Sequence, residues 1–281
     1  MAHPFSIRDI ARQSGLSEAT VDRVLNGRGG VRPATERAVH QAISDLERQQ
    51  SQVLLTGRTF QLDVVMLAPE RFSSAVRTAL ERTMPRLLPA AFRARFHLRD
   101  EGSSAEIVHD LERIRRQGSH AVVLKAPDTP EVNEAVRALV DAGIPVITLV
   151  TDLPGSRRLA YVGMDNRAAG ATAAYLLDHW LADRPGQLLV TVSSGSFRGE
   201  EEREMGFRSY FRESDVAREI VEIWESEGRD DSVERLVMDE LERTKDIVGA
   251  YSIGGGNRAL LRAFDNAGIP RPTLIAHDLD D

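Results

Sequence analysis

The sequence predicts a small all-α headpiece over residues 1–50, followed by an α/β body with parallel sheets over residues 61–281. Three short segments with apolar residues at helical spacing fill the headpiece. Beyond residue 61, short apolar runs alternate with helical stretches, which is the pattern of doubly wound parallel sheets. One segment of this body recurs later in the chain, which indicates two similar lobes.

The headpiece begins with two short helices joined by a tight turn. Ser6, with Asp9 three residues later, is a capping-box-like start for the first helix. Gly15 supplies the turn, Ser17 caps the second helix, and Asn26-Gly27 ends it. Two helices with this spacing predict a helix-turn-helix, whose second helix enters the major groove of DNA.

A third helix is predicted from Pro33, which suits a first helical position, through the apolar positions of residues 39–46. Three such helices can bury one small core, and an ordinary three-helix bundle without a DNA role is the alternative. The outward positions of the second helix favour DNA binding. They carry the residue types that contact base edges and phosphates, namely Ser17, Glu18, Ala19, Thr20 and Arg23.

A longer pattern runs without gaps through residues 10–17, 19–27 and 31–35. It closely resembles the headpiece of the LacI/GalR family of bacterial transcription regulators. The resemblance implies a homodimeric repressor that binds a palindromic operator and whose large core binds a small metabolite. The expected DNA contacts are Ser6, Ser17, Glu18, Ala19, Thr20, Arg23, Asn26 and Leu55.

Residues 51–60 are expected to form a hinge between headpiece and body. They resemble the hinge of the family, a short helix that forms on DNA and inserts a Leu into the minor groove. Leu55, three residues before Arg58, matches that position, and such apolar wedges unstack a base step and bend the duplex. The segment is shorter than usual and lacks the Tyr-x-Pro-Asn of the family, so a plain flexible linker is the alternative.

Charge is divided unevenly along the chain. Residues 1–60 carry eight Arg against six acidic residues, a net +2, whereas the whole chain carries −7. A basic headpiece on an acidic body suits DNA contact by one end, although so small a surplus also arises by chance. Affinity would then come from a dimer and from individually placed Arg residues rather than from bulk charge.

Composition excludes several other classes of protein. The absence of cysteine excludes disulfides and thiolate chemistry. The first four residues do not form a signal peptide, and no apolar run is long enough to span a membrane, so we expect a cytoplasmic protein. No cofactor or metal site is expected.

The body is predicted to alternate strands and helices. Strands are expected at residues 62–67, 94–98, 121–124, 145–149, 188–192, 219–223, 247–251 and 273–275. Helices are expected over about 15 residues after the first strand, and at residues 106–117, 131–142, 166–181, 201–211, 232–243 and 257–267.

The recurring segment is a helix, a Gly cap, an Ile-Pro turn and a strand, which leads to Asp152 in one copy and to Asp278 in the other. By resemblance this is the type I periplasmic-binding-protein fold, with two lobes and a ligand in the cleft between them. Ligands of open α/β sheets lie beyond the carboxyl ends of the strands. Both Asp side chains are therefore expected to face the cleft.

Other candidates follow from the same rule. Asp165, beside Asn166, begins a helix, and simple capping is the alternative. Arg203 matches the cleft Arg of the family, which donates to ligand hydroxyls. Asn257 follows three Gly that lack the Lys-Ser/Thr of a phosphate loop, so a tight turn near a ligand is expected. Phe72, beside Glu70 and Arg71 and after the first strand, is expected to stack on the ligand.

The expected effector contacts are Phe72, Asp152, Asp165, Arg203, Asn257 and Asp278. Carboxylates accept from neighbouring hydroxyls and Arg donates in a fixed fork, so a sugar, sugar acid or cyclitol is the favoured ligand, with a purine or small amide still open. Family members usually continue beyond the length of this chain, so we expect the C-terminal part of the core to be missing.

Three other functional classes are less well supported. A periplasmic sugar-binding protein needs a secretory signal, which the sequence lacks. An enzyme is not expected, because no Ser-His-Asp order, metal-spaced His cluster or Walker motif occurs and the pair His277-Asp278 is thin evidence. A non-regulatory, architectural DNA-binding protein would leave the large α/β body without a role.

Overall fold

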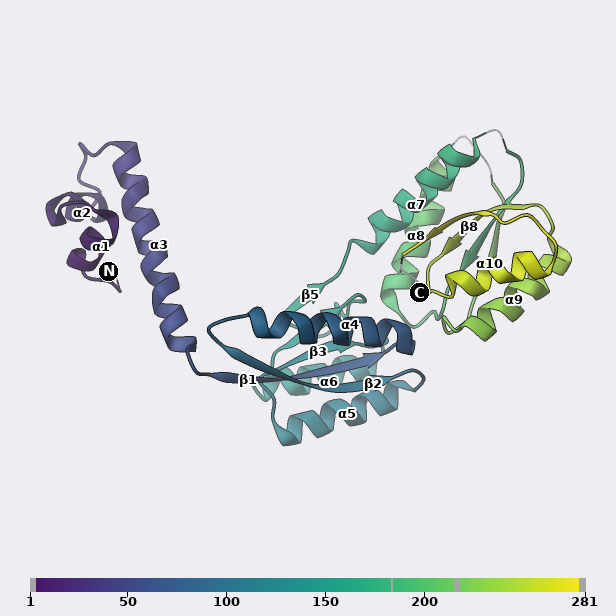
Figure 1. Cartoon of the computed structure of the whole chain (residues 1–281), viewed down its shortest axis with the longest axis horizontal. Coiled ribbons are helices and arrows are strands. Elements are labelled where there is room, and N and C mark those ends of the chain that lie inside the picture. The colour runs from purple at the N-terminus through teal and green to yellow at the C-terminus, as the bar shows by residue number, and fades with distance from the viewer. Residues whose placement is uncertain (1–3, 183, 215–217, 278–281) are drawn as a thin grey trace. The chain divides into compact units, whose positions relative to one another are not determined.

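The computed structural model describes residues 4–182, 184–214 and 218–277. The chain forms two compact units, Met1–Phe60 with Thr83–Arg93, and Gln61–Arg82 with Ala94–Asp281, hereafter the first and second unit (Figure 1). None of the described helices combines the length and the mean hydropathy that a membrane-spanning segment needs.

The first unit contains the predicted helical headpiece, which is confirmed. Its helices are α1 (Ile7–Ser14), α2 (Glu18–Leu25) and α3 (Pro33–Leu55). The hydroxyl of Ser6 accepts from the backbone N–H of Asp9 at 3.1 Å, and that of Ser17 from the N–H of Thr20 at 3.2 Å, so both caps form as predicted. Gly15 ends α1 in the left-handed conformation, with φ of 69°. Apolar side chains of all three helices share one core, in which Ile10, Ala11, Val21, Val39, Ala42 and Ile43 are buried.

Helix α3 continues through residues 51–55, where the sequence suggested a separate hinge, and ends at Leu55. The sequence explains this difference: between Pro33 and Gly57 there is neither a Pro nor a Gly, so nothing breaks the helix earlier. Gly57 then adopts φ of 74°, and strand β1 begins at Thr59.

The first sheet has the strand order β2-β1-β3-β4-β5. Its strands are β1 (Thr59–Leu67), β2 (Ala91–Arg99), β3 (Ala121–Lys125), β4 (Val146–Leu149) and β5 (Ala160–Val162). The associated helices are α4 (Glu70–Thr83), the short 3-10 helix η1 (Met84–Arg86), α5 (Ser104–Gln117) and α6 (Pro130–Asp141). Val65 and Leu67 of β1 share a core with α5 and α6, whereas Val64 and Met66 share another with α4. Helices therefore cover both faces of this sheet.

The second sheet has the order β7-β6-β8-β9, and each neighbouring pair is parallel. Its strands are β6 (Gln187–Thr191), β7 (Ile220–Ile223), β8 (Ile247–Ser252) and β9 (Thr273–Ala276), and its helices are α7 (Asn166–Leu181), α8 (Arg198–Glu213), α9 (Asp230–Arg243) and α10 (Asn257–Asn266). One core joins α7 and α8 to the sheet, and a second joins α9 and α10 to it. The predicted doubly wound α/β class is confirmed.

Strand β5 is an element that the sequence analysis does not predict. It has three residues, two of them exposed, and it pairs in parallel with β4 at the edge of the first sheet. A strand this short and this exposed lacks the apolar run by which the buried strands are identified.

Helices α7 and α8 touch through their backbones. A Cβ at Gly170 would lie 1.9 Å from the carbonyl oxygen of Arg203, and a Cβ at Gly206 would lie 2.0 Å from that of Arg167. Glycine is therefore required at both positions, because a methyl group would force the two helices apart.

Gly206→Ala is expected to lower the free energy of unfolding by about 1–3 kcal/mol, because overpacking outweighs the better helix propensity of Ala. Gly155→Ala is a suitable control, since its Cβ would meet only ordinary contacts, the nearest at 3.6 Å to Asn133. Urea unfolding followed by circular dichroism measures both variants. Equal stability of the two would contradict the close helix crossing.

Candidate functional site

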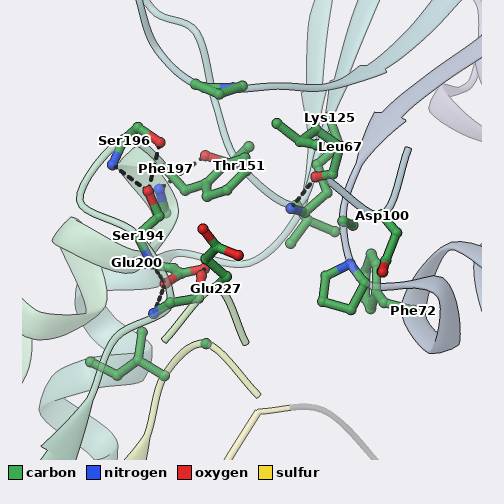
Figure 2. Close-up of a pocket in the computed structure, with 18 of the residues that line it drawn as sticks. Leu67, Phe72, Asp100, Lys125, Thr151, Ser194, Ser196, Phe197, Glu200 and Glu227 are labelled. Carbon is green, nitrogen blue, oxygen red and sulfur yellow. Dashed lines mark hydrogen bonds between the residues drawn. The ribbon is translucent and has the colours of Figure 1, made fainter. Parts of the chain in front are cut away.

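A cavity of about 710 Å³ lies in the second unit, beyond the carboxyl ends of the strands (Figure 2). Each described strand except β5 is followed by lining residues within four positions of its last residue, or ends on one. Phe72 and Asp100 follow β1 and β2, for example, and Glu227 and His277 follow β7 and β9. This is the position in which open α/β sheets bind ligands.

Arg203 of α8 reaches the cavity from a buried position, with 5% of its surface exposed. Its Nε donates to Oδ1 of Asn166 at 2.9 Å, and its Nη1 donates to the carbonyl of Ile253 at 3.1 Å. Asn166 is the first residue of α7, and Ile253 follows β8. Three elements thus orient one guanidinium, which is the arrangement a fixed hydrogen-bond donor requires.

Lys125, at the end of β3, was not predicted as a site residue. It is 9% exposed, and its Nζ donates to the carbonyl of Leu67 at 3.0 Å. The same Nζ lies 4.0 Å from the ring centroid of Phe197 and 6.0 Å from that of Phe72. The cavity therefore holds a buried cation between two aromatic rings. A charged residue directly after the apolar run of residues 121–124 was the available signal.

His277 forms part of the cavity lining next to Arg203. Its Nε2 is hydrogen-bonded to the hydroxyl of Tyr251 at 2.5 Å, and the fully buried ring of Tyr251 stacks on Phe207. Burial lowers the pKa of His277 to about 4, and the charge of Arg203 adds to that effect. The imidazole is therefore neutral at neutral pH.

Two lining carboxylates are already engaged by the protein. Asp100 accepts from the backbone N–H of Glu70 at 2.8 Å and so caps α4. Glu200 accepts from the hydroxyl and the N–H of Ser193, at 2.5 and 2.8 Å. The sequence analysis predicted neither residue, because only the folded loops bring these carboxylates to the cavity.

Two of the expected effector contacts, Phe72 and Arg203, line the cavity, but three other described candidates lie outside its lining. Asp152 is held instead by Arg158, whose Nη2 donates at 2.6 Å, and by the hydroxyl of Thr148 at 2.8 Å. Burial alone would raise the pKa of Asp152, but these hydrogen bonds outweigh it and lower the pKa.

The reason lies in the backbone before Asp152. Val150 adopts φ of 67°, an uncommon value for a β-branched residue, and the chain turns there. Val150 and Thr151 line the cavity, and the Thr151 hydroxyl accepts from the N–H of Gly199 at 3.0 Å. The turn therefore places the lining position one residue earlier than the sequence suggested.

Asp165 is exposed and caps α7, where it accepts from the N–H of Ala168 at 2.9 Å. Asn257 is buried at the first position of α10, and Gly254 lines the cavity in its place. Asp278 lies outside the described residues.

The predicted DNA contacts belong to the first unit. Glu18, Ala19 and Arg23 are exposed on α2. Ser6 and Ser17 cap helices, and the hydroxyls of Ser17 and Thr20 are hydrogen-bonded at 2.8 Å. The Asn26 side chain donates to Asp22 at 2.7 Å, and Leu55 is half-buried at the end of α3. Outward polar groups on one short helix are what direct base contact requires.

Two family models match the chain. The model for bacterial regulatory proteins of the lacI family matches residues 6–48, and the model for the periplasmic binding protein domain matches residues 90–281. The chain belongs to the LacI family of bacterial regulatory proteins. This LacI-family chain joins a DNA-binding headpiece to a periplasmic-binding-protein body, as predicted, and it is a transcription regulator.

Individual relatives agree with this assignment. The chain is 34% identical over 65 residues to the sucrose operon repressor of Vibrio alginolyticus, a match that covers 19% of this chain and 69% of that protein. The structure is similar to GanP, a glucose-galactose binding protein from Geobacillus stearothermophilus, with TM-score 0.69, 19% identity and 79% coverage of each chain. It is also similar to a solute binding protein from Agrobacterium vitis with bound D-fucose, with TM-score 0.66, 22% identity, and coverage of 74% and 72%. At these identities the solved structures establish the fold of the LacI-family body alone.

Proposed function

We propose that this LacI-family chain is a homodimeric cytoplasmic repressor whose affinity for a palindromic operator is controlled by a small polyhydroxylated metabolite. The observation that carries the proposal is the cavity, in which two aromatic rings flank Lys125 and the oriented guanidinium of Arg203 lies beside it. Aromatic faces suit the C–H faces of a sugar ring, and Arg and carboxylates pair with its hydroxyls. The sugars named for the relatives support the same ligand class.

Control of DNA affinity requires a ligand that binds two conformations of the body unequally. The cavity suits this role because its lining comes from both sheets. Around it, Arg71 of α4 donates to the carbonyl of Gly228 at 2.9 Å, and Glu101 forms an ion pair with Arg229. The Arg71–Gly228 and Glu101–Arg229 contacts join segments that follow strands of the two sheets. A ligand in the cavity would contact the same segments and so would favour one relative position of them over another.

A gel shift with the full chain tests the proposal. The DNA is a palindromic operator selected from a random library, and the probes are D-glucose, D-galactose, D-fucose, sucrose, myo-inositol and D-glucuronate, with adenine as the non-polyol comparison. We expect one polyol to change operator affinity by about 5- to 150-fold. No selected palindrome, or a response to adenine alone, would contradict the proposal. No enzymatic activity is proposed.

Arg23→Ala is expected to weaken operator binding by about 1–3 kcal/mol and to relax preference at one base pair, because a bidentate Arg distinguishes guanine by O6 and N7. Arg37→Ala, at another exposed headpiece position, is the control. Arg37→Ala can at most remove a phosphate contact, and such a loss lowers affinity without altering the selected DNA sequence. Binding-site selection with each variant measures the difference, and an unchanged profile for Arg23→Ala would count against the assignment.

A further inference from the structure

Glu227 differs from the other charged side chains that line the cavity. Within the described part of the chain, each of the others has a protein partner: Arg71 with Gly228, Asp100 with Glu70, Glu101 with Arg229, Lys125 with Leu67, Glu200 with Ser193, and Arg203 with Asn166. Among the same described residues, the one hydrogen bond of Glu227 is a backbone bond, from its N–H to the carbonyl of Ser193 at 2.9 Å. Its exposed carboxylate opens into the cavity, between the Ser194 side and the Phe72 side (Figure 2).

The backbone that carries Glu227 is in an unfavourable conformation. Glu225 and Glu227 have φ of 62° and 52°, values that L-residues other than Asn and Asp seldom adopt. Each such residue costs about 1 kcal/mol or more, and it persists only where surrounding contacts hold it. Here the Ser226 hydroxyl donates to the carbonyl of Val192 at 3.2 Å, beside the Glu227–Ser193 hydrogen bond.

The residues after Glu227 are held as well. The carbonyl of Gly228 accepts from Arg71, and Arg229 pairs with Glu101, so both contacts come from segments that follow strands of the first sheet. Glu227 is thus fixed on both sides by its neighbours, while its own carboxylate has no partner in the described structure. A pre-positioned acceptor of this kind lowers the ordering cost of binding.

We propose that Glu227 is a ligand-binding residue that accepts hydrogen bonds from two adjacent hydroxyl groups of the effector. A carboxylate only accepts, through two oxygens, and a pair of neighbouring hydroxyls presents two donors at matching spacing. Its charge also disfavours an anionic group at this end of the cavity, so a neutral polyol fits better here than a sugar acid. This inference rests on the proposed function and narrows its ligand class.

Glu227→Gln removes the charge and replaces one accepting oxygen by a donor. Calorimetric titration with D-glucose, D-galactose, D-fucose and sucrose is expected to show about 10- to 100-fold weaker binding than wild type for the sugar that binds tightest. Glu225→Gln is the matched control, because Glu225 shares the left-handed backbone and the exposure but does not line the cavity. Its affinity should stay within about twofold of wild type.

Thermal unfolding without ligand separates binding from folding. Each variant keeps a side chain of the same size at its own left-handed residue. The unfolding midpoints of the two variants should therefore match each other and that of wild type. Monodeoxy derivatives of the tightest-binding sugar then locate the hydroxyl pair. Removal of either hydroxyl should cost wild type more affinity than it costs Glu227→Gln.

The outcomes distinguish the two proposals. If wild type binds none of these four sugars and neither myo-inositol nor D-glucuronate, the proposed function falls and this inference with it. If wild type binds D-glucuronate alone, only the inference is overturned. If wild type binds a sugar and Glu227→Gln binds it equally well, only the inference is overturned. D-glucosamine that binds wild type more tightly than D-glucose, with the advantage lost in Glu227→Gln, would assign Glu227 to an ammonium group and would also overturn it.

Discussion

Arg203→Met is expected to remove the response of operator binding to its effector while leaving operator binding itself intact. The substitution deletes the donors that reach Asn166 and Ile253 and the fork available to a ligand. A ligand group left without its partner in a buried site costs about 1–3 kcal/mol, which weakens binding by about 10- to 100-fold. A gel shift titrated with the sugar that acts on wild type measures the loss.

Two further variants make this result interpretable. Arg203→Lys keeps the charge but not the planar fork, so its response should be intermediate. Arg212→Met removes another Arg of α8, an exposed side chain that donates a hydrogen bond to the hydroxyl of Ser209 and does not line the cavity, and it should respond like wild type. A response of Arg203→Met at the wild-type sugar concentration would show that Arg203 does not contact the effector.

Asp63→Ala is expected to lower the free energy of unfolding by about 1.5–3 kcal/mol, because it removes a fully buried carboxylate that accepts charged hydrogen bonds from the partly exposed Arg95. Asp63 lies in β1 with no exposed surface. Arg95 donates to it twice, at 2.6 and 2.9 Å, and Nε2 of His97 lies 2.7 Å away. The exposed pair Asp265–Arg271 has the same two-point geometry, so Asp265→Ala is the control and should cost little.

The same site predicts a dependence of stability on acid. Burial alone would raise the pKa of Asp63, but hydrogen bonds from His97, Arg95 and Ser119 outweigh it and lower the pKa to about 2. A lowered pKa stabilises the folded state above the unfolded value of 3.8, and that contribution is lost as pH falls toward 2. Asp63→Asn should therefore show a flatter loss of stability between pH 4 and pH 2 in urea unfolding. Parallel curves for wild type and variant would contradict this account.

The features that the sequence predicts well are those determined by near neighbours. Ser6, Gly15 and Ser17 act on residues three or four positions away, so the helix-turn-helix could be derived from spacing alone. The buried strands were found for the same reason, because each is a short apolar run. The sequence does not predict β5, because this strand has three residues, two of them exposed, and so contains no apolar run. It is defined by its pairing with β4.

The site was predicted less completely, because its geometry depends on distant contacts. The rule on strand ends located the cavity, and Phe72 and Arg203 line it. The left-handed backbone at Val150 places Asp152 outside the cavity lining, and no local sequence pattern predicts a turn at that residue. The position of Glu227 depends on hydrogen bonds that Ser226 and Glu227 donate to the carbonyls of Val192 and Ser193, more than thirty residues earlier, and the sequence alone does not bring these segments together.

The distribution of lining residues over the ends of so many strands has an evolutionary consequence. The polar groups that could contact an effector lie on several separate segments at the strand ends, such as Lys125 at the end of β3, Arg203 in α8 and Glu227 after β7, apart from the side chains that form the packed cores. Such positions can change one at a time without disturbing the packed layers beneath them. A change of ligand specificity therefore requires only point substitutions around the rim of the cavity. The headpiece can retain its operator specificity while the metabolite that the body binds changes.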